Sequence, residues 1–72
     1  MVDVDPVGRE GTLTIASRGS GGPGEVSVAI RGGRETFIAY SDQPISQNAN
    51  VLIIESNPSR AVTVVEWPLL DP

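Results

Sequence analysis

Hydrophobic and polar residues alternate along most of this chain with a period of two. The clearest case is residues 25–31, in which every second residue from Val26 to Ile30 is valine or isoleucine. Further stretches rich in β-branched residues lie at 12–16, 34–40, 51–54 and 61–65. Such alternation is typical of strands that bury one face, and no stretch of about eleven residues keeps the period of an amphipathic helix. We therefore predict an all-β protein without substantial helix.

The turn signals between these stretches divide the chain into five strands. Gly32 and Gly33 supply a two-residue hairpin turn, and residues 56–59 supply a longer one. Residues 41–50 are too short and too rich in turn formers for a well-formed helix. The five strands are predicted near residues 11–17, 24–31, 34–41, 50–56 and 60–67.

Five short antiparallel strands can enclose a core without helices by closing into a barrel, which removes exposed sheet edges. We predict a small five-stranded OB-like barrel over residues 11–67, with an SH3-like barrel as the alternative. Residues 1–10 form a lead-in and residues 68–72 a tail. The side chains expected to point inward are Leu13, Ile15, Val26, Val28, Ile30 and Val64.

The amino-acid composition limits the kinds of catalysis and binding that this single small domain can carry out. The 72 residues include neither cysteine, histidine nor lysine, so thiolate metal sites, disulfides and the commonest general base are excluded. We predict no catalytic residue, no bound metal and no cofactor, and hence no enzyme. Nine carboxylates against five arginines give a formal net charge of −4. That balance disfavours nucleic acid and anionic membrane surfaces, which bind through lysine and arginine.

Gly19, Gly21 and Gly24 have the spacing G-x-G-x-x-G of a dinucleotide-binding loop. That loop works only where a helix follows and points its N-terminus at the phosphates. Here a predicted strand follows, so we interpret the motif as a connector that binds no phosphate. Because it is rich in glycine and has no apolar side chain to bury, we expect residues 18–24 to be disordered.

The predicted fourth strand is apolar on both faces, whereas a small barrel has only one interior. Either the C-terminal tail and neighbouring loops cover its outer face, or a partner does. The candidate interaction surface consists of Val51, Leu52, Ile53, Ile54, Trp67, Leu69 and Leu70. A second hypothesis is an OB-fold module for single-stranded nucleic acid or oligosaccharide. Such modules stack bases on several aromatic rings and track the backbone with basic residues, and this chain has only three aromatic residues and five scattered arginines.

Several short motifs of this chain are similar to the C-terminal soluble domain of NfeD-like membrane proteins. The similarity covers roughly residues 7–67 and rests on Val7-Gly8-Arg9-Glu10-Gly11, on Pro23-Gly24-Glu25-Val26, on Phe37-Ile38-Ala39-Tyr40-Ser41-Asp42-Gln43-Pro44-Ile45, and on valine-rich strands at 51–55 and 62–66. The glycine-rich connector at 18–24 is longer than usual. Asn48-Ala49-Asn50 replaces a glycine of the family, a position where asparagine can supply a positive φ.

The resemblance implies an OB-fold domain appended to transmembrane segments and exposed to the cytoplasm. Its implied partners are stomatin/prohibitin-type membrane scaffold proteins, and its implied role is membrane organisation or protein quality control; self-association is a further possibility for the apolar surface. We expect the chain itself to be soluble and to reach a membrane only through segments outside it. No catalytic residue is carried over from the family.

Overall fold

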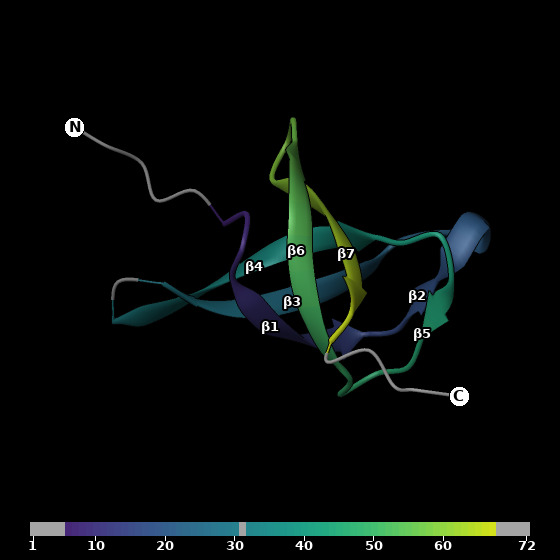
Figure 1. The fold of residues 1–72 in the computed structure, drawn as a ribbon, viewed down its shortest axis with the longest axis horizontal. Coiled ribbons are helices and arrows are strands. Elements are labelled where there is room, and N and C mark those ends of the chain that lie inside the picture. The colour runs from purple at the N-terminus through teal and green to yellow at the C-terminus, as the bar shows by residue number, and fades with distance from the viewer. Residues whose placement is uncertain (1–5, 31, 68–72) are drawn as a thin grey trace.

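The computed structural model describes residues 6–30 and 32–67 and has a closed five-stranded barrel (Figure 1). The barrel strands are β1 (Glu10–Ile15), β3 (Gly24–Ile30), β4 (Gly33–Tyr40), β6 (Asn50–Asn57) and β7 (Ala61–Glu66). Outside the barrel, β2 (Ser17–Arg18) pairs with β5 (Pro44–Ile45), and η1 (Gly19–Gly21) is one 3-10 turn. The predicted all-β class without substantial helix is confirmed. No helix among the described residues is long and apolar enough to cross a membrane.

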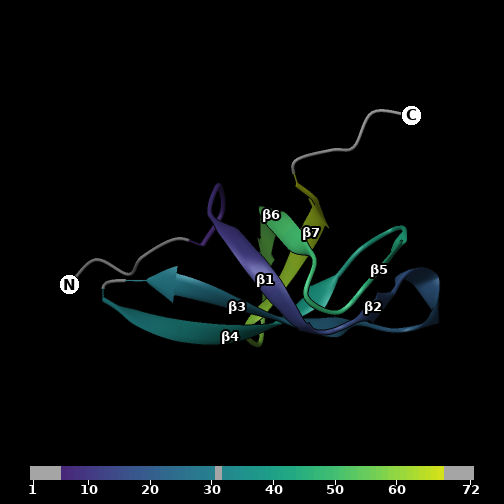
Figure 2. The same cartoon turned by 90° about the horizontal axis from the view of Figure 1, so that it is seen from below.

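The strands follow one another around the barrel in the order β1-β3-β4-β7-β6, and β6 closes onto β1. Counted among the barrel strands alone, this order is 1-2-3-5-4, which confirms the OB-like barrel. Every pair is antiparallel except β4 with β7, which run parallel over three residues each. The β6–β7 hairpin crosses the β3–β4 hairpin steeply, so the two hairpins enclose the core between them (Figures 1 and 2).

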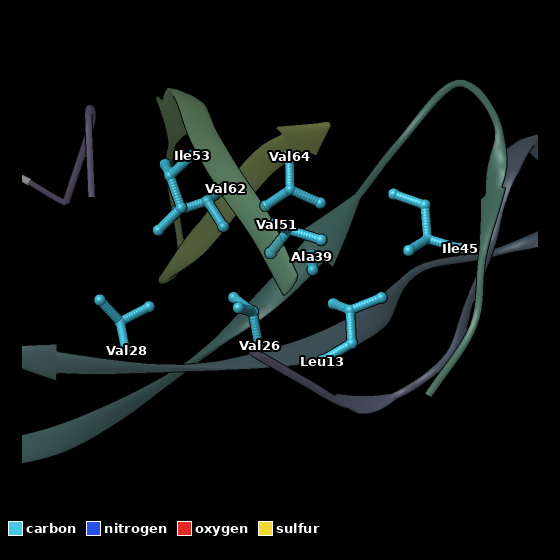
Figure 3. Close-up of a cluster of buried hydrophobic side chains, with 9 residues drawn as sticks. All are labelled: Leu13, Val26, Val28, Ala39, Ile45, Val51, Ile53, Val62 and Val64. Atoms are coloured by element: carbon cyan, nitrogen blue, oxygen red, sulfur yellow. The ribbon is translucent and has the colours of Figure 1, made fainter. Parts of the chain in front are cut away.

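The core is small and consists mainly of valine, as the narrow interior of a five-stranded barrel requires. Every barrel strand contributes to it, and one side chain from β5 closes an end of the barrel (Figure 3). Its members are Leu13, Val26, Val28, Ala39, Ile45, Val51, Ile53, Val62 and Val64. The inward orientation predicted for four of these is confirmed. Ile30, also expected inward, is partly buried and packs against this cluster.

Ile15 was expected inward, but its side chain is 52% exposed. A β-bulge is the cause. Leu13 pairs with Val26, yet Ile15 pairs with Glu25, so Thr14 is an extra residue in β1. Because one extra residue turns the following side chains to the other face, Ile15 points outward beside Glu25.

The glycine-rich segment has a defined conformation, in contrast to the expected disorder. The Arg18 N–H donates to the Gly22 carbonyl at 3.0 Å, and the Gly22 N–H donates to the Gly19 carbonyl at 3.2 Å. Gly19 is buried with φ +64°, and a Cβ there would lie 3.1 Å from the Asp42 carbonyl oxygen. Glycine thus allows this turn to pack closely against the chain before β5. It leads into strand β3, as predicted, and not into a phosphate-binding helix.

Candidate functional site

Acidic and hydroxyl side chains are the residues of the described ranges that could carry chemistry. No cluster of three acidic, histidine or cysteine residues occurs among residues 6–30 and 32–67. The buried hydroxyl of Ser17 lies 2.6 Å from the Ser41 hydroxyl, which donates to the Gln43 carbonyl oxygen at 2.7 Å. Since Ser41 gives its proton to Gln43, Ser17 donates to Ser41. Neither hydroxyl has a side-chain base as its partner, so the pair fastens β2 to the turn after β4 and does not form a nucleophile.

The outer face of β3 and β4 is the surface that OB folds commonly use for ligands. Its exposed apolar side chains here are Ile38 and Tyr40. Phe37 is on the opposite face, where the Arg60 guanidinium lies 5.1 Å from the centre of its ring. Tyr40 is therefore the one aromatic ring that the described part of this face offers, whereas single-strand binding uses several stacked rings.

The structure divides the predicted interaction surface. Val51 and Ile53 point into the barrel and are fully buried, so they are not part of the interaction surface. Leu52 is half-buried, and Ile54 is 48% exposed because it alternates with the buried Val51 and Ile53. Ile54 is also the extra residue of a second bulge, between the pairs Ile53–Val64 and Glu55–Thr63. Trp67 is 37% exposed, and Leu69 and Leu70 lie outside the described residues.

A groove of about 280 Å³ opens where β4 and β7 separate. The two strands pair only up to Tyr40 and Thr63; β7 then continues to its end, while the chain after β4 turns away towards β5. We call this hollow the β5–β7 groove (β5 and β7 are labelled in Figure 2). Its floor is formed by core side chains, and its sides combine apolar and acidic groups. The side chains that matter below are Ile45, Val64, Ile54, Val65, Asp42 and Glu66.

A more open hollow continues the groove towards the glycine-rich turn, and the two share Ser41, Asp42, Ile54 and Thr63. Tyr40, Thr63 and Glu55 lie side by side across β4, β7 and β6. The Thr63 hydroxyl donates to a Glu55 carboxylate oxygen at 3.3 Å and accepts from the Asn57 amide at 3.1 Å. The result is an apolar depression flanked by exposed carboxylates.

Sequence reasoning found Ile54 but missed the groove around it. Tyr40, Asp42 and Glu66 are far from Ile54 in sequence and meet it through the barrel's closure. One local signal was present in the sequence of residues 34–40, which do not alternate cleanly between apolar and polar. The reason is that Ile38 and Tyr40 are apolar residues on the outer face of β4.

Residues 10–65 match the family model of the NfeD C-terminal domain. The match begins at the first residue of β1 and ends one residue before the end of β7. Among solved structures, the chain is similar to the soluble domain of the NfeD protein YuaF from Bacillus subtilis. The TM-score is 0.72 with 29% sequence identity, over 88% of this chain and 75% of that one. No curated protein sequence matches the chain.

Proposed function

Because the chain belongs to the NfeD C-terminal domain family, we propose that it is a non-catalytic protein-interaction module of an NfeD-type membrane protein. In this proposal the barrel lies at the cytoplasmic face of a membrane and is attached to it through segments outside this chain. Its partner is a stomatin/prohibitin-type scaffold protein or another copy of the domain. Its role is to assemble these proteins in membrane organisation or quality control.

The observation that carries the proposal is the β5–β7 groove. Its floor is formed by the buried core residues Ile45 and Val64, and the partly exposed Val65 and the exposed Ile54 give it an apolar wall. The groove and the hollow that continues it lie next to the exposed side chains of Ile54 and Tyr40. An exposed apolar surface of this kind fits apolar side chains of a protein partner.

Replacing Ile54 with glutamate should weaken binding of a stomatin-type soluble domain by roughly 10-fold to 100-fold. Burial of an isoleucine side chain is worth about 1.5–3 kcal/mol, and each 1.4 kcal/mol changes Kd about tenfold. Isothermal titration calorimetry with the 72-residue chain measures the effect.

Ile15→Glu is the matched control. Ile15 is also an exposed isoleucine beside a β-bulge, at 52% exposure, but it does not line the groove. Its substitution should leave Kd unchanged, and thermal melts should show both variants folded. Equal weakening by both variants, or by neither, would contradict the proposal.

The OB-fold alternative predicts a different outcome with nucleic acid. We expect an oligothymidylate to bind no tighter than about millimolar in moderate salt, because few phosphates can be neutralised by a chain of net charge −4. Fluorescence anisotropy of a labelled oligonucleotide measures this. Micromolar binding that weakens steeply with salt, with chemical-shift changes at Arg31, Arg34 and Tyr40, would favour the alternative. Of these, Arg31 lies outside the described residues.

A further inference from the structure

The two ends of the molecule carry complementary chemistry. The β3–β4 hairpin projects at one end of the long axis, and β5 lies towards the other end (Figures 1 and 2). Ile45 of β5 and Val64, Val65 and Glu66 of β7 line the β5–β7 groove. We propose that the hairpin of one copy docks into the groove of a second copy, so that the chain assembles head to tail. This inference rests on the proposed function, because it names a second copy as the occupant of the groove.

The hairpin extends beyond the barrel because its neighbours stop short of it. β3 and β4 pair up to Ile30 and Gly33, but β1 pairs with β3 only as far as Val28, and β7 pairs with β4 only from Ile38 onwards. The molecule is correspondingly elongated, with extents of 41 × 24 × 17 Å. We call the described residues 29–30 and 32–34 the hairpin tip. It is free of other strands on both sides.

The hairpin tip is positively charged. Arg34 is exposed, and its Nε donates to the Ser27 hydroxyl at 2.8 Å, which holds the side chain along the hairpin. Glu35, the next residue of β4, is neutralised by Arg60, whose Nη2 lies 2.6 Å from the carboxylate. Within the described ranges, Arg34 therefore has no carboxylate partner.

The groove carries the opposite charge. Asp42 and Glu66 line it, and Glu55 lines the hollow that continues it. None of the three takes part in an ion pair, since the only ion pair within residues 6–30 and 32–67 joins Arg60 to Glu35. The Arg18 Nη2 lies beside Gly22, where the glycine-rich turn lines the hollow, and makes no ion pair with a described carboxylate. Carboxylates beside an apolar floor and the Tyr40 ring suit an arginine, which pairs with carboxylates and stacks on aromatic rings.

Both surfaces also present backbone without a strand partner. β4 has no neighbour on its outer edge before Ile38, apart from the Arg60 Nη2 that donates to the Thr36 carbonyl at 3.4 Å. β7 has none on the groove side after Thr63. Exposed edges of this kind pair with strands of other chains. Backbone hydrogen bonds between β4 of one copy and β7 of the other can thus add to the charge contact. The closed part of the barrel has no unpaired edge that could do this.

Docking of the tip into the groove is heterologous, because the two surfaces are different parts of the chain. A copy with a defective tip still has an intact groove, and a copy with a defective groove still has an intact tip. Two variants separate the surfaces: Arg34→Glu on the tip, and the double variant Asp42→Asn/Glu66→Gln on the groove, whose neutral side chains attract neither an arginine nor a glutamate tip. Arg9→Glu is the control, since it changes the charge of an exposed arginine that lies on neither surface.

Sedimentation velocity over a range of concentrations tests the proposal. The unaltered chain should form species larger than a dimer as its concentration rises, and higher salt should reduce them. Each surface variant alone should self-associate at least ten-fold more weakly, whereas Arg9→Glu should behave like the unaltered chain. An equimolar mixture of the tip and groove variants should form a one-to-one dimer and no larger species, because one intact interface remains in each pair.

A chain that stays monomeric at millimolar concentration overturns the inference, as does a mixture that fails to dimerise or an equal effect of Arg9→Glu. Such a result leaves the proposed function testable by itself. If Ile54→Glu still abolishes binding of the scaffold domain, the groove binds a different protein, and only the second copy is excluded. If scaffold binding is also insensitive to Ile54→Glu, the proposed function fails as well.

Discussion

Replacing Gly24 with alanine is expected to destabilise the protein by at least about 4 kcal/mol, most of the stability available to a domain of this size. A Cβ at Gly24 would lie 2.1 Å from the Ile15 carbonyl oxygen and 2.6 Å from the carbonyl carbon and oxygen of Ala16. All three atoms belong to the backbone, so no side-chain rotation relieves the overlap. The φ of Gly24 is not in the left-handed region, so the cost is steric.

The clash falls where β1 bulges and passes beside the start of β3. To relieve it, the two strands would have to separate near the pair of Ile15 and Glu25, which opens the barrel next to its core. Urea unfolding followed by circular dichroism measures the loss.

Gly21→Ala is the control for this substitution. A Cβ at Gly21 meets only the Arg18 Cβ, at 3.5 Å, which is an ordinary contact. The control should change the free energy of unfolding by less than about 0.5 kcal/mol. A Gly24→Ala chain with the unfolding midpoint of the unaltered protein would show that β1 and β3 are not packed as described.

The positions of the strands could be predicted from the sequence, because alternating valines leave few other ways to bury an apolar face. Each of the five predicted strands overlaps one barrel strand, and no predicted end differs from the observed one by more than two residues. Asn48 also has the positive φ, +73°, expected for an asparagine in place of a glycine. These features depend on local residue types, and local residue types are what a sequence displays.

Two bulges could not be predicted, because a bulge changes which face a residue occupies without changing the residue pattern. Ile15 continues the alternation of β1 but points outward. After the bulge at Ile54, Glu55 lies on the outer face opposite Thr63, where alternation would have turned it inward. The extra residue is recognised only in the register with the neighbouring strand. The pairing of β2 with β5 was missed for a similar reason, since each has two residues and depends on contacts across the fold.

The groove likewise depends on relations between distant residues. It exists because β7 continues past the point where β4 leaves the sheet, so its size is set by the difference between two strand ends. Ile54 could be identified from the sequence as a candidate surface residue, because it lies in a strand that is apolar on both faces. The acidic neighbours Asp42 and Glu66 looked like ordinary surface charges until the barrel placed them around that side chain.

Leu13→Ala and Ile15→Ala test the bulge in β1, because alternation alone places both side chains inside the barrel. Leu13 is fully buried, and its truncation should cost about 2–5 kcal/mol through lost burial and the cavity left behind. Ile15 is half exposed, so its truncation should cost less than about 1 kcal/mol, mostly from the weaker strand preference of alanine.

Thermal denaturation separates the two variants clearly. In a domain of 60–100 residues, each 1 kcal/mol shifts Tm by roughly 4–8 °C, so Leu13→Ala should lower Tm by about 10 °C or more. Ile15→Ala should lower it by only a few degrees. Equal losses would place Ile15 in the core beside Leu13 and remove the bulge. The bulge also brings the Ile15 carbonyl oxygen against Gly24. Without the bulge, Gly24→Ala should therefore destabilise the protein much less than predicted above.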